Sequence, residues 1–201
     1  LKSQAILQQE KIETGIAKYI FKKIPEKKGF HRLPEACEKD IFFDIEGDPT
    51  VDGGHEYLFG YILNNRFCSL WATDIEEEKD QFQTLMEIFK DHILNNPQAH
   101  IYHYNHYEVT ALKRMTVKYD RCADILDFLL RNNVFVDLYP IVRESLQTSE
   151  KGLSIKDLEI FYMENRTALV SSGADSVDMF LKWRTTQESE ILHQIEEYNK
   201  E

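Results

Sequence analysis

The stretch IFFDIEGDP, residues 41–49, places two acids one residue apart at the end of an apolar run. A β-strand alternates its side chains between two faces, so Phe42, Asp44 and Glu46 share one face. Two carboxylates that point the same way repel each other unless a cation, a proton or a donor lies between them, and a face that buries Phe42 is a costly place for them. The alternative is a strand that leaves the core with its last acids in solvent, and this stretch alone does not decide.

The remaining periodicity predicts an α/β protein in which a mixed sheet is flanked by helices. Gly53-Gly54 marks a turn into a second apolar strand, in which Tyr57 and Leu58 are expected on opposite faces. Later strands then alternate with helices, and most of the C-terminal part is predicted to be helical. The strands are expected at 39–46, 56–63, 66–73, 100–104 and 134–139, and the main helices at 75–94, 107–119 and 188–201.

The first long helix has a clear start and a clear apolar side. Asp74 and Glu77 form a capping-box pattern, and the apolar residues from Phe82 onward fall on one helical face. The run of three glutamates at 76–78 suits the positive end of the helix dipole and requires no chemistry.

Composition and charge describe a globular chain with an unusual front end. The 201 residues are 42% apolar, enough for one domain plus an appendage. Residues 1–32 carry a net charge of +5 within a chain of −11, so we expect 1–35 to be a basic connector from an upstream segment and 36–201 to be the main domain. The acidic body argues against a broad phosphate-tracking surface. No run is long enough to span a membrane and no signal peptide is evident, so a cytoplasmic location without membrane contact is expected.

Two further residues join the acids of the first strand. Glu108 lies in the first turn of the helix that follows the fourth strand, where sites collect in open α/β sheets. Tyr198 continues the stripe of Ile191 and Ile195 in the last helix, so its phenol should face the sheet. Carboxylates from a strand and a strand-to-helix junction are what a two-metal phosphodiesterase needs, because hard oxygen ligands bind Mg²⁺ or Mn²⁺.

At these residues the chain resembles the DEDD superfamily of 3′→5′ exonucleases, DEDDy type, on the ribonuclease H-like fold. It is most similar to the ribonuclease-H-like domain of bacterial RecB-family nucleases. FFDIEGDP matches the first motif, Asp-x-Glu, and IYHYNHYEVTALKR matches the second, with Glu108 where proofreading exonucleases have aspartate. VFVDLYPIVR and LSIKDLEIFY match the scaffold between motifs, and EYNKE matches the start of the third motif, Tyr-x-x-x-Asp. The resemblance covers about 38–201.

The resemblance implies a five-stranded mixed sheet, its first three strands antiparallel and the rest parallel, and a metal-dependent 3′→5′ exonuclease. Asp44 would bridge two Mg²⁺ or Mn²⁺ ions, Glu46 and Glu108 would bind one each or their waters, and Tyr198 would orient the attacking water. The substrate would be nucleic acid, with DNA favoured over RNA. Family members are joined to a RecB-like nuclease segment and in some cases to a helicase, which places the chain in DNA metabolism such as repair.

The resemblance also implies substrate contacts at Gly47, His103 and Asn105. Its third motif has an aspartate directly after position 201, so the chain as given is expected to be inactive or nearly so. The alternative function is a non-catalytic nucleic-acid-binding or scaffolding module of a larger nuclease or helicase.

Several other polar residues have plainer interpretations. The histidines at 100, 103 and 106 do not share one strand face, so a tri-histidine metal site is not expected. Asp137 is either functional or a cap that satisfies nearby backbone donors. Charged side chains on helices usually face solvent, although three of them could contact substrate phosphates: Lys113, Arg114 and Arg143.

Overall fold

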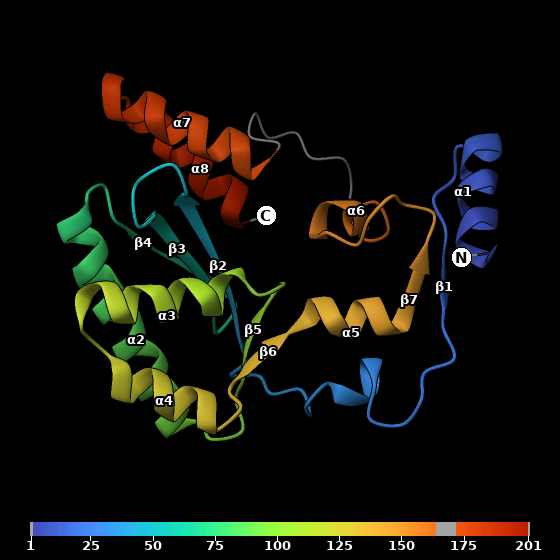
Figure 1. Ribbon diagram of the computed structural model, residues 1–201, viewed down its shortest axis with the longest axis horizontal. Coiled ribbons are helices and arrows are strands. Elements are labelled where there is room, and N and C mark those ends of the chain that lie inside the picture. The colour runs from blue at the N-terminus through green and yellow to red at the C-terminus, as the bar shows by residue number, and fades with distance from the viewer. Residues whose placement is uncertain (1, 164–171, 201) are drawn as a thin grey trace. The chain divides into compact units, whose positions relative to one another are not determined.

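The computed structural model describes residues 2–163 and 172–200, and the chain divides into two compact units (Figure 1). Unit 1 comprises Leu1–Glu35 and Asp137–Thr167, and unit 2 comprises Ala36–Val136 and Ala168–Glu201. Residues 137–167 thus group with the N-terminal segment that is expected to be a connector. The connector role of residues 1–35 stays a prediction.

Unit 2 is built on the mixed five-stranded sheet that the sequence predicts. β2 pairs antiparallel with β3 and parallel with β5, and β3 pairs antiparallel with β4. The spatial order across the sheet is β4 (Arg66–Trp71), β3 (His55–Leu63), β2 (Ile41–Asp48), β5 (Ile101–His103) and β6 (Phe135–Asp137). The α/β fold and its strand order along the chain are therefore confirmed.

Helices cover both faces of this sheet (Figure 1). The large core cluster packs α2 (Ile75–Asn95), α3 (Tyr107–Tyr119) and α4 (Ala123–Arg131) against β2, β3 and β5. A second cluster joins β3 to α7 (Gly173–Thr186) and α8 (Ser189–Lys200), and its buried members are Tyr57, Leu58, Phe180, Ile191 and Ile195. The predicted helices at 75–94 and 107–119 are confirmed with shifts of one residue at most. The helix predicted at 188–201 is confirmed from Ser189 to Lys200, and position 201 lies outside the described residues.

The two faces of β2 differ as the alternation requires. Ile41, Phe43 and Ile45 are buried in the large core, so Asp44 and Glu46 lie on the opposite face. The expected burial of Phe42 is wrong, because 51% of this residue is exposed. Its ring stacks on Tyr102 of the neighbouring strand with centroids 5.4 Å apart, so it packs sideways along the sheet instead of into a core.

A β-bulge breaks the expected alternation in β3. Glu46 lies opposite Leu58 but Gly47 lies opposite Glu56, so β3 contains one extra residue, Tyr57. Tyr57 and Leu58 consequently both contact the second cluster, and the prediction that they face opposite sides is wrong. The bulge also places Glu56 beside the end of β2, next to the acids of the predicted site.

Unit 1 contains a small sheet that the sequence patterns did not predict. β1 (Tyr19–Phe21) pairs antiparallel with β7 (Leu146–Thr148), two segments that are far apart in the sequence. The predicted strand at 134–139 ends at Asp137, and a helix begins directly after it. The remaining elements are α1 (Lys2–Thr14), the 3₁₀ helix η1 (Gly29–Arg32), α5 (Leu138–Ser145) and α6 (Ile155–Glu159).

Among the described residues, none of the helices combines the length and the apolar character that a membrane crossing requires.

Candidate active site

Three acids meet at the carboxyl end of β2. Asp44 and Glu46 lie on the strand itself, and Glu108 lies in the first turn of α3, which follows β5. Because β2 and β5 run parallel, their carboxyl ends lie at the same edge of the sheet. The turn between β5 and α3 uses Asn105 in the left-handed conformation, at φ 75°, which starts the helix at that edge. The structure therefore brings together the three predicted carboxylates.

The charge on Asp44 is opposed by its surroundings. The pKa of Asp44 is raised well above its ordinary value, first by burial, which disfavours the charged form, and then by repulsion from the carboxylates of Glu46 and Glu108. A hydrogen bond to Glu108 raises it further. Asp44 nevertheless has an exposed surface. The repulsion among the three acids is therefore the cause of the raised pKa that the geometry of the strand supports. A shared proton or a cation at this point would relieve that repulsion.

Glu108 is buried, with 3% of the residue exposed. Its Oε2 atom lies 3.3 Å from Nδ1 of His103, but that nitrogen also lies 2.7 Å from the carbonyl oxygen of Asn105, to which it donates if it carries the proton. Glu108 Oε2 has no hydrogen-bond partner among the described residues. A buried carboxylate oxygen without a donor is costly, so this atom is suited to a positively charged ligand.

α8 brings an amide to the acids. Asn199 donates a hydrogen bond from Nδ2 to Asp44 Oδ2 at 3.0 Å. The approach is possible because Gly60 lies opposite Asp44 in β3, and a methyl group on Gly60 would overlap Oδ1 of Asn199. Glycine inside a strand often marks such a close approach. Gly60 thus fixes where the last turn of α8 meets the sheet.

The rest of α8 is anchored on the same face. Ile191 and Ile195 are buried in the second cluster, while Ser69 and Trp71 of β4 both donate hydrogen bonds to Glu196. Tyr198 is half-buried on the same helix and lies close enough to Tyr57 to raise the pKa of that phenol, after burial and Glu46 as larger causes. The prediction that the Ile191–Ile195–Tyr198 stripe faces the sheet agrees with this burial.

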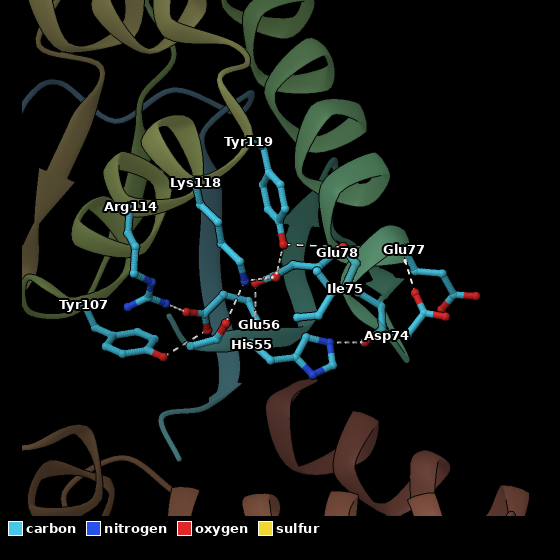
Figure 2. A network of polar contacts seen from close by, with 12 residues as sticks. His55, Glu56, Asp74, Ile75, Glu77, Glu78, Tyr107, Arg114, Lys118 and Tyr119 are labelled. Carbon is cyan, nitrogen blue, oxygen red and sulfur yellow. Dashed lines mark hydrogen bonds and ion pairs between the residues drawn. The ribbon is translucent and has the colours of Figure 1, made fainter. Parts of the chain in front are cut away.

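A second pair of acids, beside the site, is fully neutralised (Figure 2). Glu56 and Glu78 are 0% and 1% exposed, and the backbone N–H of Glu56 donates to Glu78 at 2.7 Å. Arg114 forms an ion pair with Glu56, and Lys118 forms one with Glu78 at 2.7 Å. Both cations come from α3, so the network ties the helix that carries Glu108 to β3 and α2.

Tyr107 links this network to the candidate site. Its hydroxyl donates to Glu56 Oε2 at 2.9 Å, and burial, followed by the charge of Glu46, raises the pKa of Tyr107 to about 12, so the hydroxyl keeps its proton. A methyl group on Gly47 would overlap both the Glu56 carboxylate and this hydroxyl. Gly47 therefore has a structural reason to be glycine, and its predicted contact with substrate stays a prediction.

The other predicted site residues have local contacts. Asn105 Oδ1 accepts from the backbone N–H of His106 at 2.9 Å, which shapes the turn before α3. His103 lies beside Glu108, whereas His100 Nδ1 lies 3.8 Å from Asp40 Oδ1, so the two histidines have different neighbours. The substrate roles predicted for His103 and Asn105 stay predictions.

The alternative roles considered for Asp137, for the arginines on helices and for the glutamates at 76–78 have different outcomes. Asp137 caps α5 by accepting from the backbone N–H of Tyr139 at 2.9 Å. Arg114 binds buried Glu56 instead of facing solvent, and the Arg143 guanidinium lies 5.7 Å from the ring centre of Tyr139. The interpretation of the 76–78 glutamates as a simple helix start is wrong at one position, because Glu78 is buried and paired.

Four residues that shape this region, Glu56, Gly60, Glu78 and Asn199, were not predicted from the sequence. For three of them the sequence holds a pattern that could have indicated their position. Gly60 is a glycine within an apolar strand, Glu78 lies four residues before Phe82 on the apolar stripe of α2, and Asn199 follows Tyr198 directly. No sequence pattern indicated the position of Glu56, because that position depends on the β-bulge.

The mixed sheet and the acids at the end of β2 define an α/β protein of the ribonuclease H type. A family model described as the RNase H superfamily matches residues 41–201, and the chain belongs to that superfamily. No curated protein and no solved structure matches the chain significantly. The family makes this a nucleic-acid-processing domain of the nuclease type, whose substrate is nucleic acid.

Nucleases of this superfamily usually use divalent metal ions, which raises the question whether the three acids could hold such an ion. Within residues 2–163 and 172–200, no three His, Cys, Asp or Glu side chains already converge as a metal-binding group. The donor set is nevertheless all carboxylate, which suits Mg²⁺ or Mn²⁺, and buried Glu108 Oε2 lacks a hydrogen bond among the described residues. Asp44, Glu46 and Glu108 therefore fit a divalent cation in their chemistry, and their exact positions would adjust on binding.

We expect Gly60→Ala to lower the free energy of unfolding by about 1–3 kcal/mol, because the new methyl group overlaps the Asn199 amide. Asn199→Ala removes that obstacle, so the two changes should couple by about 0.5–3 kcal/mol in a double-mutant cycle measured by urea unfolding. Gly173→Ala is the control, since a methyl group there meets nothing within 4 Å. Strictly additive losses at 60 and 199 would contradict this packing.

Glu78→Gln should cost up to about 3 kcal/mol, because it leaves Lys118 without its carboxylate partner in a largely buried site. Glu76→Gln is the matched control two residues away. Glu76 has 85% of its side chain exposed, so its loss should stay within about 0.5 kcal/mol. Thermal unfolding of both variants tests the network, and equal stabilities would show that Glu78 contributes nothing beyond a surface charge.

Proposed function

We propose that this domain is a metal-dependent phosphodiesterase of the 3′→5′ exonuclease type that acts on nucleic acid, with DNA favoured over RNA. The observation that carries the proposal is the meeting of three carboxylates, Asp44 and Glu46 from β2 and Glu108 from α3, at one edge of the sheet. Such mutual repulsion is maintained at functional sites more often than elsewhere. The family supports the nuclease class, and the resemblance of the three motifs supports the exonuclease type.

Asp44, Glu46 and Glu108 would hold two Mg²⁺ or Mn²⁺ ions, which when bound would supply positive charge that offsets the acids and the scissile phosphate. The protein side chains would do the positioning. Asn199 holds one oxygen of Asp44 at 3.0 Å, and Tyr198 would orient the attacking water from the same turn of α8. Water would form the new bond to phosphorus as the 3′-oxygen of the preceding nucleotide leaves.

The arrangement of α3 supports this assignment. Tyr107, Arg114 and Lys118 hold the helix to Glu56 and Glu78, so Glu108 is fixed by neighbours that carry their own counter-charges. Those two acids are already paired with cations and are not candidates for metal ligands. The proposal assigns that role to Asp44 and Glu46 on β2 and to Glu108 at the start of α3.

A second candidate function is a non-catalytic nucleic-acid-binding or scaffolding module of a larger nuclease or helicase. It is favoured by one observation, that within the described residues no three candidate ligands already converge on a metal position. Such a module would bind nucleic acid, the substrate class of the family, without hydrolysing it.

The first test measures Mn²⁺ binding to the chain through the change in the protein's melting temperature as Mn²⁺ is added. A hundredfold excess of Mn²⁺ over its dissociation constant should stabilise the fold by about 2.7 kcal/mol. Asp44→Asn should abolish most of that gain, while the metal-free variant should be as stable as the unaltered chain or slightly more stable, because a like charge is removed. Asp127→Asn is the control, since Asp127 is an exposed acid paired with Arg131 on α4.

The second test is digestion of 5′-labelled single-stranded DNA and RNA with Mn²⁺. The resemblance puts a fourth carboxylate directly after position 201, so the chain is compared with two extended forms that carry Asp or Asn there, followed by the same helix-forming tail. Activity should appear with Asp, shorten the labelled strand from its 3′ end, and vanish with Asn or with Asp44→Asn. Metal binding without digestion by any form would favour the binding module, and a wild-type rate for Asp44→Asn would refute the assigned role of Asp44.

A further inference from the structure

Unit 1 carries a continuous row of four aromatic rings. Tyr19 and Phe21 are two residues apart on β1 and therefore share one face of the small β1–β7 sheet. The Tyr19 ring lies 5.7 Å from Phe21 and 5.2 Å from Phe161, and the Phe21 ring lies 6.0 Å from Phe30, all between centroids. The rings thus follow one another in the order Phe161, Tyr19, Phe21, Phe30, drawn from three separate stretches of the chain.

Much of this row is open to solvent. Phe21 is 66% exposed, Tyr19 is 46% exposed and Phe30 is 37% exposed. The neighbouring rings meet edge to face instead of stacking on one another, at interplanar angles of 66° to 85°. Contiguous exposed aromatic surface of this kind usually marks a binding site in a folded protein. We call the surface formed by Phe161, Tyr19, Phe21 and Phe30 the aromatic row.

The aromatic row lies in the most basic segment of an acidic chain. Residues 18–32 hold six Lys or Arg and one Glu, whereas the whole chain has a net charge of −11. Lys22 and Lys23 follow Phe21 directly, and Lys28 lies two residues before Phe30. Two of the six are paired with acids, Lys18 with Glu10 and Arg32 with Glu144. Lys22 Nζ instead donates to the carbonyl oxygen of Arg143, which carries no charge. The charge of this segment is complementary to a polyanion.

We propose that the aromatic row is a binding site for single-stranded nucleic acid formed by residues of unit 1. Unpaired bases stack on exposed aromatic rings, and lysines beside the rings contact the phosphates. A duplex would be a poor ligand, because its bases already cover one another. The proposal rests on the nucleic-acid substrate class of the family and not on hydrolysis.

Fluorescence anisotropy with labelled oligo(dT) and oligo(U) in EDTA tests this site without metal-dependent cleavage. Phe21→Ala should weaken binding about 5- to 150-fold, the equivalent of the 1–3 kcal/mol typical of one stacked base. Phe21→Trp should retain binding and Phe21→Leu should lose it, because leucine keeps apolar bulk but has no π face. Ile20→Ala is the matched control, since Ile20 is 41% exposed on the opposite face of the same strand.

The lysines are tested by salt dependence. Lys23→Gln and Lys28→Gln should each weaken binding to both oligonucleotides and reduce the slope of log K against log salt by about 1. A blunt-ended duplex of the same sequence should bind at least tenfold more weakly than the single strand. Melting temperatures of the two lysine variants should be unchanged, because these side chains are exposed. Phe21→Ala loses its edge-to-face contacts with Tyr19 and Phe30 and should melt at a lower temperature, so binding is measured well below that temperature.

Three outcomes would overturn the proposal: no binding of single strands in EDTA, wild-type affinity for Phe21→Leu, or the same loss in Ile20→Ala as in Phe21→Ala. A fourth would reassign the surface. If sedimentation shows a dimer that Phe21→Ala dissociates and no oligonucleotide binds, the aromatic row contacts a second copy of the chain. Failure of the digestion assay with intact binding in EDTA would reject the proposed catalysis and leave this site standing.

Discussion

Carboxylates repel one another, and this chain holds three of them at one edge of a sheet. Asp44 shows the consequence, since its pKa is raised by burial and by the charges of Glu46 and Glu108. The nearby acids Glu56 and Glu78 avoid the same problem, because each has a basic partner from α3. Under the proposed function, the two acids with basic partners from α3 belong to the scaffold, and Asp44, Glu46 and Glu108 would hold the metal ions.

The scaffold around the acids depends on a few local constraints. The bulge in β3 brings Glu56 beside the end of β2, and Gly47 leaves the space that the Glu56 carboxylate and the Tyr107 hydroxyl occupy. Gly60 leaves the corresponding space for the Asn199 amide on the other side. Two glycines, one on each strand, thus leave room for polar groups from both helices: the Tyr107 hydroxyl of α3, which donates to Glu56, and the Asn199 amide of α8, which donates to Asp44.

The secondary-structure elements could be predicted well from the sequence. The contacts between residues far apart along the chain could not. Periodicity located the strands and long helices because each pattern is local to its element, whereas the parallel arrangement of β2 and β5 was expected from the family resemblance. Contacts set by the bulge could not be foreseen, because one extra residue changes which side chains share a face. The burial of Glu78 was visible as an acid on the apolar stripe of α2. The pairing of β1 with β7 joins segments more than 120 residues apart, which no local pattern reveals.

We propose that Asp44, Glu46 and Glu108 form a divalent-cation site. Crystals of this chain grown with Mn²⁺, with diffraction collected at the manganese absorption edge, test this proposal. An anomalous peak within bonding distance of Asp44 and of at least one of the other two acids is the predicted result. No anomalous peak at these acids at millimolar Mn²⁺ would contradict it.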